Sequence, residues 1–167
     1  LLFLGTCYGF KPLSYSNPDN DEYVVNTAIR ESRALKEDRL GRQALCLLGT
    51  PDVQANDLQH GDSVFSRLIN ECRLAGDKET EARAFAFRGM YTLIGPATLQ
   101  NKIIYLQKAA DIYHEIHYTE GEINVLTDVG YLMVITSQLQ NAYEVFLKAL
   151  QLGEDIHFPY TQYNTDA

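Results

Sequence analysis

The sequence predicts an all-α protein, an α-solenoid in which antiparallel helical hairpins stack on one another. Three series of residues carry this prediction, because they recur with one period. The first series is Ala28, Leu68, Ala109 and Ala149, at spacings of 40, 41 and 40 residues. The second is Gly49, Gly89 and Gly130, at spacings of 40 and 41. The third is Leu58, Leu99 and Leu139, at spacings of 41 and 40. Such a period indicates stacked hairpins, none of which can bury its apolar face alone.

The clearest hairpin lies within residues 126–150. Leu126, Val129, Gly130 and Met133 fall at i, i+3, i+4 and i+7, the spacing of one helix face. A second apolar face, formed by Ala142, Phe146, Ala149 and Leu150, follows a polar break at Thr136, Ser137 and Gln138. Because Gly costs about 1 kcal/mol relative to Ala inside a helix, Gly130 is expected to serve close packing of the two helices.

This hairpin resembles the tetratricopeptide repeat. Six residues match consensus places of that motif: Leu126, Val129, Gly130, Ala142, Phe146 and Ala149. Met133 stands where the family usually has Tyr, and Glu154 where it often has Pro. The period of about 40 residues and the ending over residues 109–116 resemble the long-repeat variety found in sensory regions of bacterial histidine kinases and diguanylate cyclases. The resemblance implies a superhelix of antiparallel hairpins.

The chain divides into residues 1–20 and a repeat domain, residues 21–167. Residues 1–7 are too short to span a bilayer, which needs about 20 apolar residues. They are compatible with the tail of a signal peptide, with a lipoprotein cleavage site at Cys7, or with a segment that caps the first helix. The sequence leaves these alternatives open.

The repeat domain begins with a helix whose predicted face comprises Tyr23, Val24, Thr27, Ala28 and Leu35. Hairpin turns are expected near residues 56–59, 94–98 and 136–140, and joints between hairpins near residues 74–79 and 116–121. Pro51 is expected to shorten or kink its helix, and Gly95-Pro96 to end the next first helix. A further first helix is expected from Tyr160 to Ala167, truncated at its C-terminal end.

Composition excludes several functions. A net charge of −8, a pI near 4.9 and only 14 Lys and Arg residues argue against nucleic acid as a partner, and against acidic membranes. The three cysteines have no CxxC spacing, and Cys46, set among leucines, is predicted to be a small buried residue. A membrane association is expected only through segments that flank this sequence.

The motifs of enzymes are missing from the sequence. It has no phosphate-binding Gly-x-x-x-x-Gly-Lys loop, no Gly-x-Ser-x-Gly elbow and no Gly-x-Gly-x-x-Gly fingerprint. His114, His117 and Glu120 could face one side of a helix, yet they lack the His-Glu-x-x-His spacing of a zinc site. We therefore expect no enzyme activity, no metal and no cofactor, and keep a helical hydrolase or metal site around His114 and His117 as an alternative.

The function that remains is the binding of a partner at the surface of the protein. In the resembled family the first helices of the hairpins line a groove, and the resemblance carries this role to Gln43, Cys46, Thr50, Arg83, Ala86, Met90, Asn124, Thr127 and Tyr131. The family members that grip a chaperone's terminal carboxylate need Lys where this chain has Cys46, Ala86 and Thr127. That ligand class is therefore disfavoured, and Tyr131 is the expected anchor.

We expect a module that binds a protein or peptide. The resemblance implies the N-terminal sensory region of a bacterial signal-transduction protein, a histidine kinase or a diguanylate cyclase, in the periplasm or otherwise outside the cytoplasm. The alternative is a cytoplasmic repeat regulator that binds a short peptide. The sequence does not identify the ligand or the output domain. It also leaves the oligomeric state open, and a homodimer is one of the alternatives.

Overall fold

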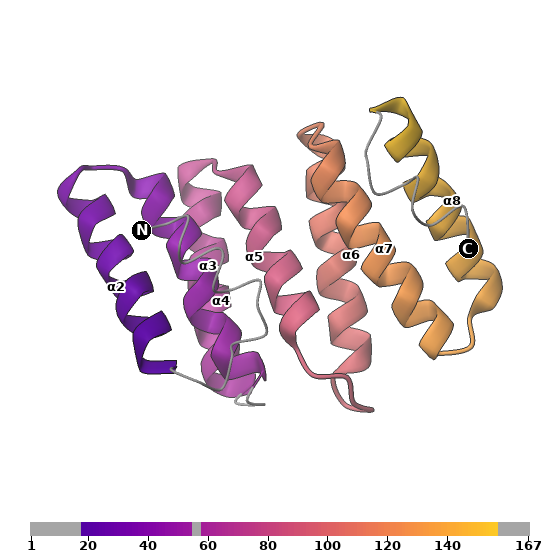
Figure 1. Ribbon diagram of the computed structural model, residues 1–167, viewed down its shortest axis with the longest axis horizontal. Coiled ribbons are helices and arrows are strands. Elements are labelled where there is room, and N and C mark those ends of the chain that lie inside the picture. Colours follow the sequence, from indigo (N-terminus) through magenta and orange to yellow (C-terminus); the bar gives the residue numbers. More distant parts are fainter. Residues whose placement is uncertain (1–17, 55–57, 157–167) are drawn as a thin grey trace.

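The computed structural model describes the backbone of residues 18–54 and 58–156, and within these the side chains of residues 26–47 and 61–156 (Figure 1). The regular elements of the described residues are all α-helices: α2 (Pro18–Ala34), α3 (Asp38–Gln54), α4 (Leu58–Ala75), α5 (Lys78–Tyr91), α6 (Leu99–Glu115), α7 (Thr119–Ile135) and α8 (Leu139–Asp155). No strand occurs among them. The all-α prediction is confirmed.

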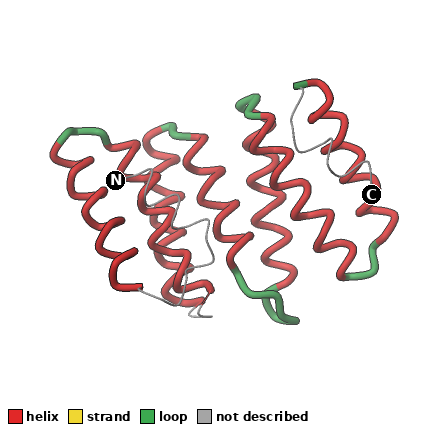
Figure 2. Tube along the Cα trace, viewed as in Figure 1, coloured by secondary structure: helices red, strands yellow, loops and turns green. Residues whose placement is uncertain are grey.

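Each helix packs on its neighbour along the chain, from α2 on α3 to α7 on α8. One further pair has extensive contacts, α3 with α5, whereas α5 and α7 do not meet as extensively in the part of the chain that the structure describes. Figure 2 shows that the loops after α2, α4 and α6 lie along one edge of the molecule, and those after α5 and α7 along the opposite edge. The described helices therefore run alternately up and down.

Two glycines let the helices of a hairpin approach closely. A Cβ added at Gly130 of α7 would lie 2.6 Å from Cε1 of Phe146 on α8, and one at Gly89 of α5 would lie 2.6 Å from Cγ of Leu106 on α6. These distances are far below an ordinary contact of about 3.5–4.0 Å between carbon atoms. The prediction that Gly130 serves packing is confirmed, and Gly89 does the same one period earlier.

The joints between hairpins share one backbone conformation. Lys36, Gly76 and His117 have φ values of 59°, 68° and 56°, and each follows a second helix. The amide of the next residue reaches back into that helix, as from Asp77 N to Cys72 O at 2.9 Å and from Tyr118 N to Tyr113 O at 2.9 Å. This left-handed cap satisfies the last carbonyls of the helix and stops it. The predicted joints at residues 74–79 and 116–121 are confirmed.

The turn between α5 and α6 is held by a buried lysine. α5 ends at Tyr91, before Gly95-Pro96, so the expectation that these two residues end the helix is wrong. The Nζ of Lys102 instead donates to the carbonyl oxygens of Gly89, Met90 and Thr92, the last at 3.0 Å. A cation at this end is favoured by the helix dipole. Burial lowers the pKa of Lys102, and the carboxylate of Asp128 acts in the opposite direction.

Three other expectations need correction. α3 continues past Pro51 to Gln54, so this proline does not shorten the helix. Leu58 and Leu139 lie within the expected turns at residues 56–59 and 136–140, but they are the first residues of α4 and α8, as Leu99 is of α6. Leu35 lies beyond the end of α2 and is 72% exposed, so it does not belong to the buried face that contains Ala28. The predicted turn at 136–140 is confirmed, but it ends at Gln138.

Several expectations lie outside the described residues. They concern residues 1–17, with the signal-peptide and lipoprotein alternatives, and the further helix from Tyr160 to Ala167. Part of the turn near residues 56–59, the side chains of Tyr23, Val24 and Thr50, and the surroundings of Gly49 also fall outside. Within the described part, no helix is long and apolar enough to cross a membrane.

Candidate functional site

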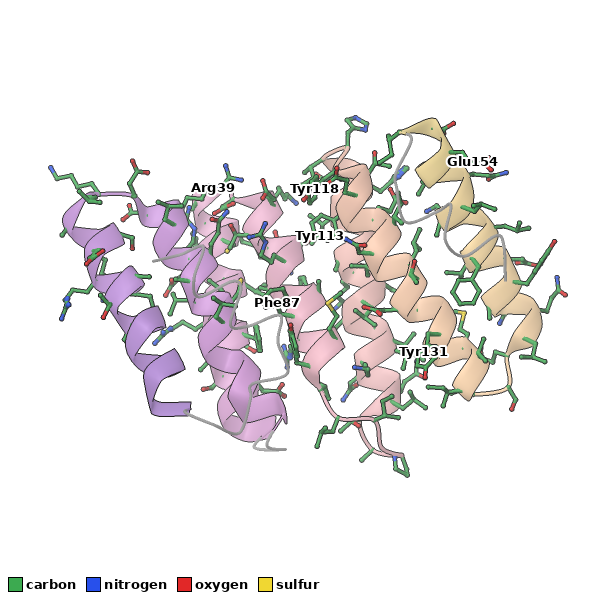
Figure 3. The ribbon with its side chains drawn as sticks, viewed as in Figure 1. Arg39, Phe87, Tyr113, Tyr118, Tyr131 and Glu154 are labelled. Atoms are coloured by element: carbon green, nitrogen blue, oxygen red, sulfur yellow. The ribbon has the colours of Figure 1, made fainter. Side chains whose placement is uncertain are left out.

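An exposed row of polar and aromatic side chains runs along α7. Asn124, Thr127 and Tyr131 are all exposed, and Tyr131 is 61% exposed. Their spacing of three and four residues places them on one side of the helix, and the row is about 10 Å long at 1.5 Å per residue. Figure 3 shows Tyr131 near the C-terminal end of α7, on the half of the molecule away from Tyr113 and Tyr118. This is the largest part of the predicted groove that remains accessible.

The row is exposed because α7 packs only through its other sides. Val125, Leu126, Val129 and Leu132 are buried where α7 meets α6 and α8. Among the described residues, the contact between α5 and α7 is less extensive than that between α3 and α5. The hydroxyl of Thr127 donates to the Ile123 carbonyl oxygen at 2.9 Å, so it is satisfied within the helix. Asn124 and Tyr131 therefore supply the polar groups that a partner could reach.

The predicted residues on α3 and α5 are less accessible. Gln43, Arg83 and Met90 are half-buried, and Met90 packs against the core. The guanidinium of Arg83 lies 3.3 Å from a carboxylate oxygen of Glu79, one turn away on the same helix. Arg83 is thus partly engaged within the protein.

Cys46 and Ala86 are packing residues. Cys46 is 0% exposed and Ala86 is 4% exposed, so neither can line a groove. Burial raises the pKa of the Cys46 thiol far above its usual range, and raises that of Cys72 to about 12. The prediction that Cys46 is a small buried residue is confirmed. The side chain of Thr50 lies outside the described ones.

A polar cavity of about 540 Å³ lies at the edge that carries the joints, a feature that the sequence analysis missed. Arg39 and Arg42 of α3 face the start of α5 there, and Arg39 and Tyr118 lie along the same edge in Figure 3. Arg39 pairs with Glu79, and Arg42 Nε lies 3.0 Å from an oxygen of Asp77. Since these charges already neutralise one another, the cluster joins α3 to α5 and is a poor site for a charged ligand.

Asp77 is the centre of this cluster. Its side chain accepts a hydrogen bond from the Thr80 amide at 3.2 Å and so caps the start of α5. Burial alone would raise the pKa of Asp77, but the hydrogen bonds from Thr80 and Arg42 outweigh burial and lower it. Arg39 and Glu79 have opposite charges and are 40 residues apart, one period of the sequence, which is the signal that could have indicated this contact.

The two histidines are not brought together. The Nδ1 of His114 lies 3.0 Å from a carboxylate oxygen of Glu122, whereas His117 occupies the joint after α6. Among the described residues, no group of three His, Cys, Asp or Glu side chains is placed to hold a metal ion. The Glu122 carboxylate is also paired with Lys148, whose Nζ lies 2.7 Å away. His114 therefore takes part in a polar cluster that links α6, α7 and α8.

No family model matches the chain, and no curated protein matches it.

Proposed function

We propose that this chain is a binding module of the tetratricopeptide type, an α-solenoid whose partner is a protein or peptide and which carries out no catalysis itself. The observation that carries the proposal is the exposed row of Asn124, Thr127 and Tyr131 on α7. Tyr offers a large contact area and a polar tip at a modest entropic cost, and it is enriched among residues that dominate binding energy.

The solenoid is supported by the packing of each helix on its chain neighbour and by the recurrence of small residues at close helix contacts. The close contacts at Gly89 and Gly130 are one period of the sequence series apart. This is expected when one hairpin repeats along the chain. We further propose, from the resemblance alone, that the module is the extracytoplasmic sensory region of a bacterial signal-transduction protein.

The test is a binding screen that compares two matched variants. A peptide array is probed with the wild type, with Asn124→Ala/Tyr131→Ala on α7, and with Tyr143→Ala on α8. Tyr143 is a suitable control because it is 59% exposed, nearly as much as Tyr131 at 61%. We expect peptides selected by the wild type to be lost by the α7 variant, with affinity falling at least about thirtyfold for a residue worth 2 kcal/mol.

The same peptides should bind the Tyr143→Ala variant as they bind the wild type. Circular dichroism must show equal helix content in all three proteins, because the substituted residues are exposed. Equal binding by the α7 variant and the wild type would refute the proposal that the α7 row is the binding surface. Adding Arg83→Gln then tests whether the half-buried residues of α5 contribute.

A further inference from the structure

Each of the first helices α3, α5 and α7 packs on two second helices, the one before it and the one after it. α4 and α6 flank α5, α6 and α8 flank α7, and α2 and α4 flank α3. One sequence place in these first helices is occupied by Glu81 in α5, Glu122 in α7 and Gly41 in α3. We call the surroundings of these three residues the α5, α7 and α3 slots.

In the α5 and α7 slots a buried carboxylate is held by basic side chains. The side chains of Glu81 and Glu122 are 4% and 3% exposed. An oxygen of Glu81 lies 2.7 Å from Nε of Arg73, and the Glu122 carboxylate contacts His114 at 3.0 Å and Lys148 at 2.7 Å. Arg73 and His114 both stand eight residues before their glutamate. A buried carboxylate requires such partners, because burial of an unpaired charge is costly.

The α3 slot has the cation without the carboxylate. Arg33 stands eight residues before Gly41, at the place of Arg73 and His114, and it forms no ion pair with any described residue. A cavity of about 410 Å³ opens beside it, between α2, α3 and the end of α4. Its lining combines Arg33, Ser32 and Gly41 with the apolar side chains of Ile29, Leu45 and Leu74.

The other charged side chains that line this cavity limit the class of ligand that it can bind. Arg42 is paired with Asp77, and Glu71 lies 3.6 Å from Arg67, so Arg33 is the cation left for a ligand. Asp38 and Glu71 also line the cavity and would repel a second negative charge. The cavity therefore favours a single carboxylate over a dicarboxylate or a phosphate.

We propose that the α3 slot binds the carboxylate of a ligand, which takes the place that Glu81 and Glu122 occupy in the other two slots. Arg33 pairs with this carboxylate, and a short apolar chain of the ligand lies against Ile29, Leu45 and Leu74. The ligand is a small monocarboxylic acid or the acidic side chain of a peptide. This site is separate from the α7 row and does not depend on the function proposed for it.

The experiment uses hexanoate as the probe and its uncharged analogue hexanamide as the chemical control. Backbone amide shifts of Gly41 and Ser32 are followed by NMR during titration of the full chain. We expect saturable shifts with hexanoate and none with hexanamide. Arg33→Gln should weaken hexanoate binding about tenfold or more, because it removes a charge-assisted hydrogen bond. Arg30→Gln, on an exposed residue of α2 outside the lining, should change it less than about twofold.

A second variant places a carboxylate of the protein itself in the α3 slot. A Cβ at Gly41 would lie 2.7 Å from Oγ of Ser32, so Gly41→Glu is combined with Ser32→Ala. The new glutamate should pair with Arg33 and abolish hexanoate binding while helix content stays unchanged. A blocked peptide whose one carboxylate is a Glu side chain identifies the source of the ligand: binding of the peptide alone indicates a peptide, and binding of hexanoate alone indicates a free acid.

The proposal is overturned if neither probe gives saturable shifts, or if hexanamide binds as hexanoate does. It is equally overturned if Arg33→Gln binds like the wild type, or if the filled variant still binds. These results leave the proposal for the α7 row unaffected, since that row is tested with other variants.

Discussion

Replacing Gly89 by Ala should destabilise the protein, although Ala is the better helix former. The added Cβ would lie 2.6 Å from Cγ and 2.8 Å from Cδ2 of Leu106, and 3.2 Å from the backbone oxygen of Lys102. Leu106 is 0% exposed, so it has no free space to enter, and the carbonyl can move only with α6. Overpacking costs up to about 3 kcal/mol and the gain in helix propensity is about 1 kcal/mol. The expected loss is therefore about 2 kcal/mol.

Gly130→Ala is the matched comparison for Gly89→Ala. The new Cβ would lie equally close to its nearest neighbour in both variants, but this neighbour is exposed at Gly130 and buried at Gly89. The new Cβ would lie 2.6 Å from Cε1 of Phe146, but this ring is 37% exposed and can turn toward solvent. Overpacking at its lower limit of about 1 kcal/mol then cancels the gain in propensity, so the net change should be near zero. Gly130→Leu should still cost about 1 to 3 kcal/mol, because the larger side chain displaces Phe146.

Urea unfolding followed by far-UV circular dichroism measures these changes, with the exposed substitution Glu144→Gln as a control expected to be silent. A Gly89→Ala protein as stable as the wild type would refute the close contact between α5 and α6. Equal losses for Gly89→Ala and Gly130→Ala would refute the argument that the exposed neighbour absorbs the clash.

Three further predictions concern the joints and the turn after α5. Gly76→Ala should cost about 1 to 2 kcal/mol in urea unfolding, because φ is 68° there and no contact obstructs the new Cβ, which isolates the backbone strain. Lys102→Met should cost about 2 to 4 kcal/mol by the same measurement, since it leaves the carbonyl oxygens at the end of α5 without their charged donor, whereas Lys108→Met should cost less than about 1 kcal/mol. Asp77 has a folded-state pKa below its usual 3.8, so its carboxylate stabilises the fold above pH 3.8 and this contribution is lost as the pH falls through the folded-state value. The free energy of unfolding, measured from about pH 5 to about pH 2, should fall less steeply for Asp77→Asn, and equal slopes would contradict the assignment.

The sequence by itself determined the helices and their phase. Gly89 and Gly130 recur at one place because the two helices of each hairpin approach closely there, and a side chain at that place would collide with its neighbour. The joints could also be placed, since Gly76 and the residues around it mark a helix end. These features depend on contacts between residues near one another in the chain, and such contacts leave a local pattern.

The tertiary structure decided which of the predicted site residues a partner could reach. Periodicity treats Arg83 and Asn124 as equivalent, yet Arg83 is half-buried beside Glu79 while Asn124 is exposed. α5 packs extensively on α3, whereas the contact between α7 and α5 is less extensive. Likewise, only the fold brings Lys102 to the end of α5. Exposure and ion pairing depend on how neighbouring hairpins pack against each other, and a sequence period specifies the order of hairpins but not the distance between their faces.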